Sequence, residues 1–453
     1  MDFFMSHVAP TSGVNPPFEA ALSPTLFPSF TEPIFSLPVD WKKYASAPNV
    51  VTGAKRFSAE AKLVESVPLE TEGLKTPGVP LTQEEWIRLI DGATHTIDLE
   101  QFYITQKEGE ALDPVLAAIS RAIARGVRVR AVIANTLMKD PVKNRENIAS
   151  LEKLKALGVA VRMIDLGPVS GGIVHAKYWI IDDKTIFVGS QNFDWRSLDH
   201  IFEVGILTND PAEVAKAQCV FNLDWKIAET GQKPTAEMLA CPTDEKEDDP
   251  TITFVASPPG LLPDGVPIEK EQLLKAIGGA KKRIRINLHS FSPLEFYTPD
   301  KKPHYWEEFQ KVLWEAAVIR KIPVQLMVSE SNIRAPQDQP ISPHWAFLKS
   351  LAQIPGIEVR VVFIPDHSSG IIYYARVDHA KFATIDEEWF WVSSSNGTEG
   401  YFENTRDVAV VGTRPETTKT LDNMFDALWT SSYTKDINTF PPPLNLRPQS
   451  KFR

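Results

Sequence analysis

Two copies of one polar pattern recur at matched spacing in this chain of 453 residues. Each copy begins with a histidine and has a lysine, an aspartate and an asparagine two, seven and seventeen residues later. The two sets are His175, Lys177, Asp182 and Asn192, and His379, Lys381, Asp386 and Asn396. A lone His-x-Lys is most simply the polar face of an edge strand, but four polar positions repeated on a matched frame indicate a functional site.

Imidazole, ammonium and carboxamide groups together suit chemistry on an anionic phosphate ester. Such a site must neutralise the phosphate charge and supply both an attacking group and a proton for the leaving oxygen. A neutral imidazole can attack and a protonated one can donate a proton, and both forms are accessible near neutral pH. The lysines and asparagines can donate hydrogen bonds to the non-bridging oxygens. No spacing typical of metal ligands occurs in the sequence, so neither a metal nor a cofactor is expected.

Two carboxylates share a further offset. Glu203 and Asp407 each follow the histidine of their own half by 28 residues. A carboxylate commonly holds a ring N–H of a reactive imidazole and fixes its tautomer, and we expect these two in that role. Surface carboxylates are the simpler alternative, and Glu403 is a rival for the second position. Asp182 and Asp386 are expected to be structural, because strand alternation turns them away from the histidine and lysine.

Internal repetition extends beyond these residues. The segment "LIDGATHTIDLEQF" (89–102) is echoed by "AIGGAKKRIRINLHS" (276–290), and "RGVRVRAVIA" (125–134) is echoed by "RKIPVQLMVS" (320–329). Helical patterns lie between these strand-like segments, an alternation that favours crossover units. We therefore expect an α/β fold of two pseudo-symmetric repeats. Each repeat is expected to be a mixed, largely parallel β-sheet flanked by helices, with the active site at the interface of the two halves.

The repeats also set the expected domain boundaries. We expect an extended Pro-rich arm over 1–54, a first repeat over 55–240, an acidic linker over 241–251, a second repeat over 252–440 and a C-terminal tail over 441–453. Two further residues stand near the repeated motifs. Arg196 is expected to pair with a carboxylate or to contact substrate, and His289, at a strand end, is more simply a hydrogen-bonded core or rim histidine than a functional one.

The doubled His-x-Lys-x4-Asp pattern, followed by Gly-Ser-x-Asn, resembles the signature of the phospholipase D superfamily. The first copy has Gly189 and Ser190, whereas the second has Ser393 in place of the glycine. Longer stretches, among them "VRMIDLGPVSGGIVHAKYWIID", "NFDWRSL" and "NLHSFSPLEFY", are similar to one branch, the lysosomal 5′ exonucleases of single-stranded nucleic acid. The resemblance extends from about residue 60 to residue 440.

This resemblance implies a metal-independent phosphodiesterase, a 5′ exonuclease on single-stranded DNA or RNA that works through a phosphohistidine intermediate. It favours His175 as the nucleophile and His379 as the general acid and base, with the reverse assignment left open. The catalytic residues it implies are His175, Lys177, Asn192, Glu203, His379, Lys381, Asn396 and Asp407. A phospholipase D or transphosphatidylase would need the same residues, because only the leaving group differs. A catalytically silent scaffold is a third alternative, which the intact histidine–lysine pairs disfavour.

Composition limits the partners and the compartment. The net charge of −10 disfavours a general nucleic-acid coat or a binder of anionic membranes, while it allows a local basic site. The expected partner is the substrate itself, single-stranded nucleic acid or phospholipid, and the oligomeric state stays open, with a homodimer as one option. Cys219 and Cys241 could form one bridge, but a reducing or redox-neutral setting is the simpler expectation.

The sequence shows no leader of basic and then apolar residues and no run of about 18 apolar residues. We therefore expect a soluble protein without signal peptide or membrane anchor, most simply in the cytoplasm.

Overall fold

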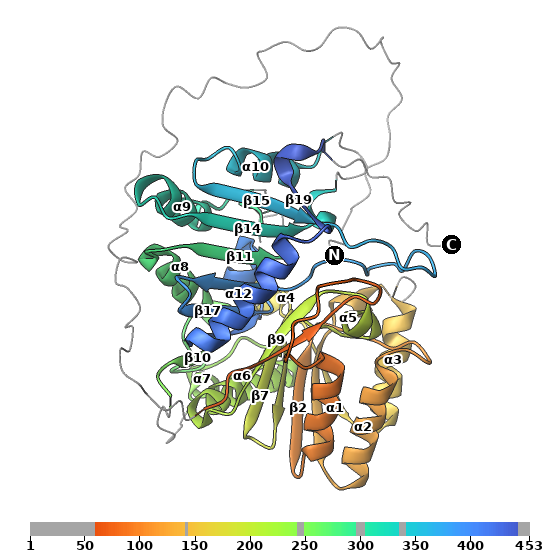
Figure 1. Cartoon of the computed structure of the whole chain (residues 1–453). Helices are drawn as coiled ribbons and strands as arrows, with labels where there is room; N and C mark the ends of the chain where they lie inside the picture. Colours follow the sequence, from red (N-terminus) through yellow and green to blue (C-terminus); the bar gives the residue numbers. More distant parts are fainter. Residues whose placement is uncertain (1–58, 141–143, 242–248, 296–303, 335–340, 443–453) are drawn as a thin grey trace, which may run out of the picture. The chain divides into compact units, whose positions relative to one another are not determined.

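Two β-sheets, one from each half of the chain, organise the computed structural model (Figure 1). The structure describes residues 59–140, 144–241, 249–295, 304–334 and 341–442. All of them belong to one unit that spans residues 44–453. The expected N-terminal arm, most of the acidic linker and nearly all of the C-terminal tail lie outside the described residues.

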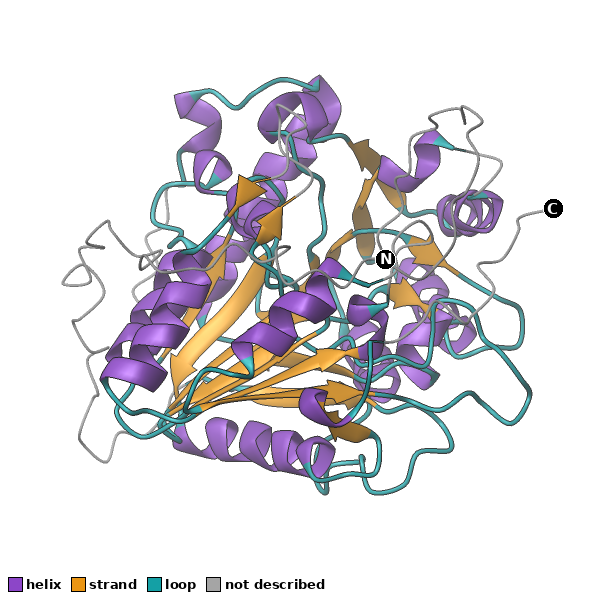
Figure 2. Cartoon of the chain, turned by 90° about the horizontal axis from the view of Figure 1, so that it is seen from above, coloured by secondary structure: helices purple, strands orange, loops and turns teal. Residues whose placement is uncertain are grey.

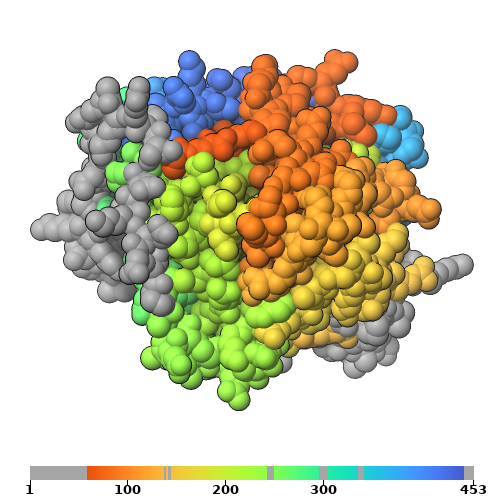
Figure 3. Space-filling model, turned by 90° about the horizontal axis from the view of Figure 1, so that it is seen from below, coloured from red at the N-terminus to blue at the C-terminus, as the bar shows by residue number. Residues whose placement is uncertain are grey.

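The first sheet has seven strands in the order β1-β9-β7-β6-β2-β4-β5. They are β1 (Lys62–Ser66), β2 (Thr96–Gln101), β4 (Arg128–Ala134), β5 (Ala160–Ile164), β6 (Lys177–Ile181), β7 (Thr185–Gly189) and β9 (Glu203–Thr208). Within this sheet, β2 pairs in parallel with β4 and β4 with β5, and the remaining pairs are antiparallel. Residues of the first half, coloured orange to green, form most of the coloured surface in the view from below (Figure 3).

The second sheet repeats this order and adds one strand, as β10-β18-β17-β16-β11-β14-β15-β19. Its strands are β10 (Ile252–Ala256), β11 (Ile284–Leu288), β14 (Val324–Ser329), β15 (Ile357–Val362), β16 (Phe382–Ile385), β17 (Trp389–Ser393), β18 (Val408–Thr413) and β19 (Thr434–Asp436). Two mixed sheets in two repeats are thus confirmed. The expected predominance of parallel pairing is wrong, because parallel pairs again join only three strands of this sheet, β11, β14 and β15. The strand that follows the motif histidine, β16, continues into β17 and β18 as an antiparallel meander. The other pairs are also antiparallel.

Helices cover both sheets (Figure 2). The longer ones are α1 (Thr82–Gly92), α2 (Asp113–Ala124), α3 (Arg145–Ala156), α6 (Pro211–Thr230), α8 (Glu269–Gly279), α9 (Glu308–Trp314), α10 (Pro343–Leu351) and α12 (Pro415–Trp429). The short helices are α4 (Gly167–Ser170), α5 (Trp195–Asp199), α7 (Ala236–Leu239) and α11 (Glu399–Glu403). Two-residue strands lie at β3 (Ile104–Thr105), β8 (Phe193–Asp194), β12 (Leu294–Glu295) and β13 (His304–Tyr305). Single turns of 3-10 helix occur at Thr136–Lys139, Pro259–Leu261, Glu330–Ile333 and Ile437–Thr439, and a π-helical turn at Glu315–Ile319.

Three buried clusters explain the layers. A central cluster joins the inner faces of both sheets with α6 and α12. One outer cluster packs α1, α2 and α3 on the first sheet, and the other packs α8, α9 and α10 on the second. Strand alternation decides which side chain joins which cluster: Trp179 of β6 packs outward, whereas its neighbours Tyr178 and Ile180 pack into the central cluster.

The two cysteines are joined in a disulfide, Cys219–Cys241. Because α6 ends at Gly231 in a left-handed conformation, the chain doubles back through α7 and brings Cys241 beside the helix that carries Cys219. The structure has the bridge that the sequence left open, so the argument for a reducing or redox-neutral setting, and with it for the cytoplasm, loses its support. None of the helices in the described part of the chain is both long and apolar enough to cross a membrane.

Candidate active site

Each motif histidine lies beside a strand end of the opposite half. The backbone N–H of His175 donates to the carbonyl of Arg406 at 2.9 Å, and the N–H of His379 donates to the carbonyl of Phe202 at 2.9 Å. These contacts belong to two matched parallel bridges between the halves. Because Asp407 follows Arg406 and Glu203 follows Phe202, the bridges bring one carboxylate of each half to the histidine of the other.

The result is two crossed imidazole–carboxylate pairs. Nδ1 of His175 lies 2.9 Å from Oδ1 of Asp407, and Nδ1 of His379 lies 2.9 Å from Oε2 of Glu203. A carboxylate at Nδ1 fixes the ring and leaves Nε2 as the nitrogen for a reacting group. The equal offsets in the sequence single out both carboxylates but do not show that each serves the other half.

Hydroxyl groups hold the two carboxylates. Ser197 donates to Oε1 of Glu203 at 3.0 Å, and Ser394 donates to Oδ1 of Asp407 at 2.6 Å. Burial raises the pKa of Glu203 to about 8, although the nearby ammonium of Lys381 acts to lower it. Burial also raises the pKa of Asp407 well above its ordinary range. The pair of Glu203 and His379 can therefore hold a proton that a reaction could use.

The two motif lysines are fully buried next to the histidines. Nζ of each donates to the backbone carbonyl of the histidine two residues earlier, at 2.6 Å for Lys381. Burial lowers the pKa of Lys381 to about 7, against the opposing charge of Glu203. Burial likewise holds the pKa of Lys177 well below its usual range, with Asp407 opposing. An anion bound between these groups would favour their charged forms.

The motif asparagines complete the polar part of the site. Asn192 and Asn396 are buried, and Oδ1 of each has no hydrogen-bond partner within the described ranges. Because the two ends of a carboxamide are interchangeable by rotation, either side chain can turn its NH2 toward a ligand. The structure thus brings together the two histidines, the two lysines and the two carboxylates expected from the sequence, and buries the asparagine of each motif.

The rings around the two histidines differ. The ring of His175 lies between those of Phe102 and Tyr401, with centroids 5.3 and 4.9 Å away. The ring of His379 instead has His289 at 4.8 Å. The sequence does not single out Phe102 or Tyr401, and for His289 it favours a hydrogen-bonded core or rim role over a functional one. Phe102 and His289 occupy equivalent positions in the two repeated segments, just after β2 and β11. This equivalence is the sequence feature that could have indicated a place for both at the site.

Both imidazoles are neutral when no anion is bound. Burial lowers the pKa of His175 well below its ordinary value, and the charges of Lys177 and Lys381 act in the same direction. Burial and Lys381 have the same effect on the pKa of His379. A neutral imidazole is the nucleophilic form, and bound phosphate would raise both pKa values by adding negative charge.

The motif aspartates are structural, as expected. Asp182 and Asp386 sit in left-handed turns directly after β6 and β16. Asp182 accepts hydrogen bonds from the backbone N–H groups of residues 94–96 and from the hydroxyl of Thr94. Asp386 accepts from the backbone N–H groups of residues 281–283. Although partial burial acts to raise it, these bonds lower the pKa of Asp182 to about 2.

The exchange of glycine for Ser393 in the second motif has a steric cause. A Cβ on Gly189 would lie 2.1 Å from Oε1 of Gln191, whose amide nitrogen donates to Thr82 at the start of α1. In the second half Glu269 stands at the start of α8 and accepts from the hydroxyl of Ser393 at 2.5 Å. The first half has the longer side chain, Gln191, next to the motif glycine, whereas the second half has it, Glu269, on the helix. The second motif therefore accommodates Ser393 where the first has glycine.

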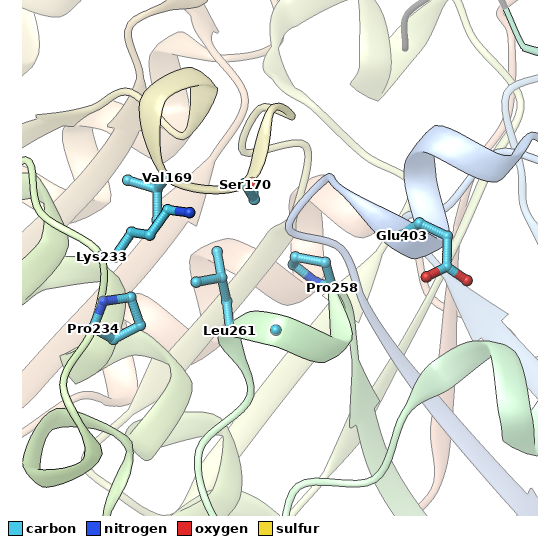
Figure 4. A pocket seen from close by; sticks show the side chains of 8 residues that line it. Val169, Ser170, Lys233, Pro234, Pro258, Leu261 and Glu403 are labelled. Atoms are coloured by element: carbon cyan, nitrogen blue, oxygen red, sulfur yellow. The ribbon is translucent and has the colours of Figure 1, made fainter. Parts of the chain in front are cut away.

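Two other candidates fall outside the pairs. Arg196 forms an ion pair with Asp194 at 2.6 Å, which is the carboxylate alternative expected for it. Glu403 pairs with Lys270, so it does not serve His175. Glu403 and Ser170 line a hollow of about 300 Å³ beside α4 and α11 that contains none of the eight residues (Figure 4). Within the described residues, no group of three or more His, Cys, Asp or Glu side chains is placed to hold a metal ion.

Comparison with known proteins identifies the family. A family model described as "Cardiolipin synthase, PLD-like domain" matches residues 86–225 and 273–429, one segment in each half. The chain belongs to the phospholipase D superfamily. The phosphatidylserine synthase of Haemophilus influenzae Rd KW20 has a similar fold, with a TM-score of 0.54 at 12% identity over 78% of this chain and 85% of that one.

Curated relatives of this superfamily match most of the chain. Phospholipase D Z of Dictyostelium discoideum is 29% identical over 84% of this chain and 91% of its own length. Phospholipase D Y of the same organism is 30% identical over 84% of this chain and 92% of its own length. The human 5′-3′ exonuclease PLD3 is 28% identical over 84% of this chain and 81% of its own length. The expected phosphodiesterase of the phospholipase D superfamily is confirmed at this level.

Proposed function

We propose that the protein is a metal-independent 5′ exonuclease that cleaves single-stranded DNA or RNA through a phosphohistidine on His175. The observation that carries the proposal is the crossed pair of imidazoles, His175 with Asp407 and His379 with Glu203, each 2.9 Å from its carboxylate. Two histidines held at Nδ1 in this way offer two Nε2 atoms to one phosphate, one to attack and one to protonate the leaving oxygen.

In the first step, Nε2 of His175 attacks phosphorus and the bond to the leaving 5′ oxygen breaks. Nε2 of His379 gives its proton to that oxygen. The raised pKa of Glu203 keeps a second proton in its pair with His379, and this proton can move to Nδ1 as the first one leaves. The products of the step are a phosphohistidine and an alcohol.

In the second step, water attacks the phosphohistidine. Nε2 of His379 takes a proton from the water, and the bond between phosphorus and Nε2 of His175 breaks. Lys177 and Lys381 neutralise the non-bridging oxygens in both steps, and Asn192 and Asn396 donate hydrogen bonds to them. The two ammonium groups and the two carboxamide donors together stabilise the phosphate charge that a metal ion stabilises in other phosphodiesterases.

The surroundings of the two histidines support His175 as the nucleophile. Phe102 and Tyr401 flank its ring, and apolar neighbours favour the uncharged imidazole. His379 instead has a polar neighbour, since the ring of His289 lies 4.8 Å from its own. A more polar environment suits the group that changes its protonation state in each step.

A nucleic acid as substrate is supported by the similarity to the human exonuclease and by the quoted sequence stretches. Phospholipase D activity is the second candidate, favoured by the similarity to the Dictyostelium phospholipases. The test incubates the purified chain with 5′-hydroxyl single-stranded oligonucleotides and, separately, with phosphatidylcholine, each with a chelator between pH 5 and 8. Release of nucleotides from the 5′ end supports the exonuclease, whereas release of choline without nucleotide release overturns it.

A further inference from the structure

His289 and Phe102 occupy equivalent places at the reaction centre. Each is the first residue after its strand, β11 for His289 and β2 for Phe102. The ring of His289 lies 4.8 Å from that of His379, and the ring of Phe102 lies 5.3 Å from that of His175. The two repeats therefore place an imidazole on one side of the site where they place a phenyl ring on the other.

The contacts of His289 define what its imidazole can offer. Nδ1 lies 3.0 Å from the backbone carbonyl oxygen of Asp378, and because a carbonyl only accepts, Nδ1 carries the proton. Burial lowers the pKa of His289 well below its ordinary value, so the ring is neutral and Nε2 has a free lone pair. No described residue forms a hydrogen bond to Nε2. An imidazole with an unprotonated Nε2, to which no described residue donates, thus stands beside the ring of His379.

We propose that His289 orients the water that opens the phosphohistidine and thereby selects water over alcohols as the phosphoryl acceptor. This inference rests on the function proposed above. Water has two protons: one passes to Nε2 of His379, while the other forms a hydrogen bond to Nε2 of His289. The water oxygen bonds to phosphorus, and the electron pair of the broken P–N bond stays on Nε2 of His175.

An alcohol cannot satisfy both histidines. Its single O–H proton passes to His379, so an alkyl group faces Nε2 of His289. A site built to hydrogen-bond a ligand discriminates against an analogue that leaves its buried polar group unpaired. Phe102, at the equivalent place beside His175, has no such acceptor and lies on the side of the P–N bond.

Two substitutions distinguish the role of Nδ1 of His289 from that of Nε2. The His289→Asn carboxamide can keep the hydrogen bond to the carbonyl of Asp378 but does not extend to the position of Nε2. The His289→Gln carboxamide can place a polar atom near that position. Phe102→Leu is the matched control, because it changes the equivalent ring without adding or removing a hydrogen-bond acceptor.

The measurement is the partition of the phosphoryl group. Each protein is given a 5′-hydroxyl oligonucleotide in aqueous methanol, and mass spectrometry compares the free 3′-phosphate product with its methyl ester. The expected result for His289→Asn is an ester fraction raised about fivefold, the factor that one hydrogen bond of ordinary net strength provides. His289→Gln should show a smaller rise, and Phe102→Leu should leave the ratio as it is in the unchanged protein.

The ratio is independent of the overall rate, so a general loss of activity does not move it. An unchanged ratio in His289→Asn, with the unchanged protein active, overturns the role of His289 alone. An equal rise in Phe102→Leu also overturns it, because that variant keeps the acceptor. If the unchanged protein transfers phosphate to neither water nor methanol, the exonuclease proposal fails, and this inference fails with it.

Discussion

His175 and Asp407 are 232 residues apart in the chain, and Nδ1 of the one lies 2.9 Å from Oδ1 of the other. Glu203 and His379 form the matching contact, again at 2.9 Å. Each half of the molecule therefore supplies the carboxylate that orients the other half's histidine. Neither repeat has a complete histidine–carboxylate pair of its own, so the proposed chemistry requires both halves in this arrangement.

Substitution Asp407→Asn is expected to reduce kcat about a hundredfold or more, because the amide no longer stabilises the ring proton and tautomer of His175. The hydroxyl of Ser394 can still donate to the new side-chain oxygen, so the fold should persist. The measurements are steady-state kinetics and thermal unfolding of the same preparation. Glu403→Gln is the matched control, since Glu403 pairs with Lys270, and it should keep activity near the original level. An equal loss in both variants would contradict the assignment.

Binding of inorganic phosphate at pH 8 is expected to take up protons. Burial holds the pKa of Lys381 at about 7, so at pH 8 most of this group is uncharged. Bound phosphate favours the ammonium form and raises that pKa, so a proton moves from solvent to protein. Calorimetric titration in buffers of different ionisation enthalpy measures the uptake. Net proton release at pH 8 would contradict the account.

Much of the site follows from the sequence, because local spacing determines it. The offsets from His175 to Lys177 and Asn192 recur in the second half, and strand alternation separates the lysine from Asp182. The crossed pairing does not follow in this way. Glu203 lies 28 residues after His175, yet it contacts His379, 176 residues away. Equal offsets fit pairing within a half and pairing between halves equally well, and only the bridges between the halves decide.

The sequence did not determine the strand directions or the disulfide, for related reasons. Alternating strands and helices favoured parallel crossovers, but β6, β7 and β9 follow one another as an antiparallel meander. The long helical patterns in the sequence lie outside this segment, so they do not predict how its strands pair. Cys219 and Cys241 meet because the chain reverses after α6, a tertiary event that two cysteines 22 residues apart do not reveal by themselves.

The disulfide gives a prediction of its own. Replacing both Cys219 and Cys241 with serine is expected to lower the free energy of unfolding by about 3 kcal/mol, because the bridge restricts a loop of the unfolded chain. Denaturant unfolding measures this change, and intact mass before and after reduction verifies the bond. Catalytic rates of the folded variant should be unchanged, since neither cysteine contacts the histidines. An unchanged mass on reduction would show that the bond does not form.

The central claim is that His175 carries the phosphoryl group during turnover. The most direct test mixes the His379→Asn variant with a nucleoside 3′-(p-nitrophenyl phosphate), whose leaving group needs no acid, and quenches in alkaline denaturant. Peptide mass spectrometry then locates the phosphate. The account predicts a stoichiometric burst of p-nitrophenol and a nucleoside 3′-phosphoryl group on His175, both absent when His175 is also replaced. No burst and no modified His175, while the unchanged protein turns over, would contradict it.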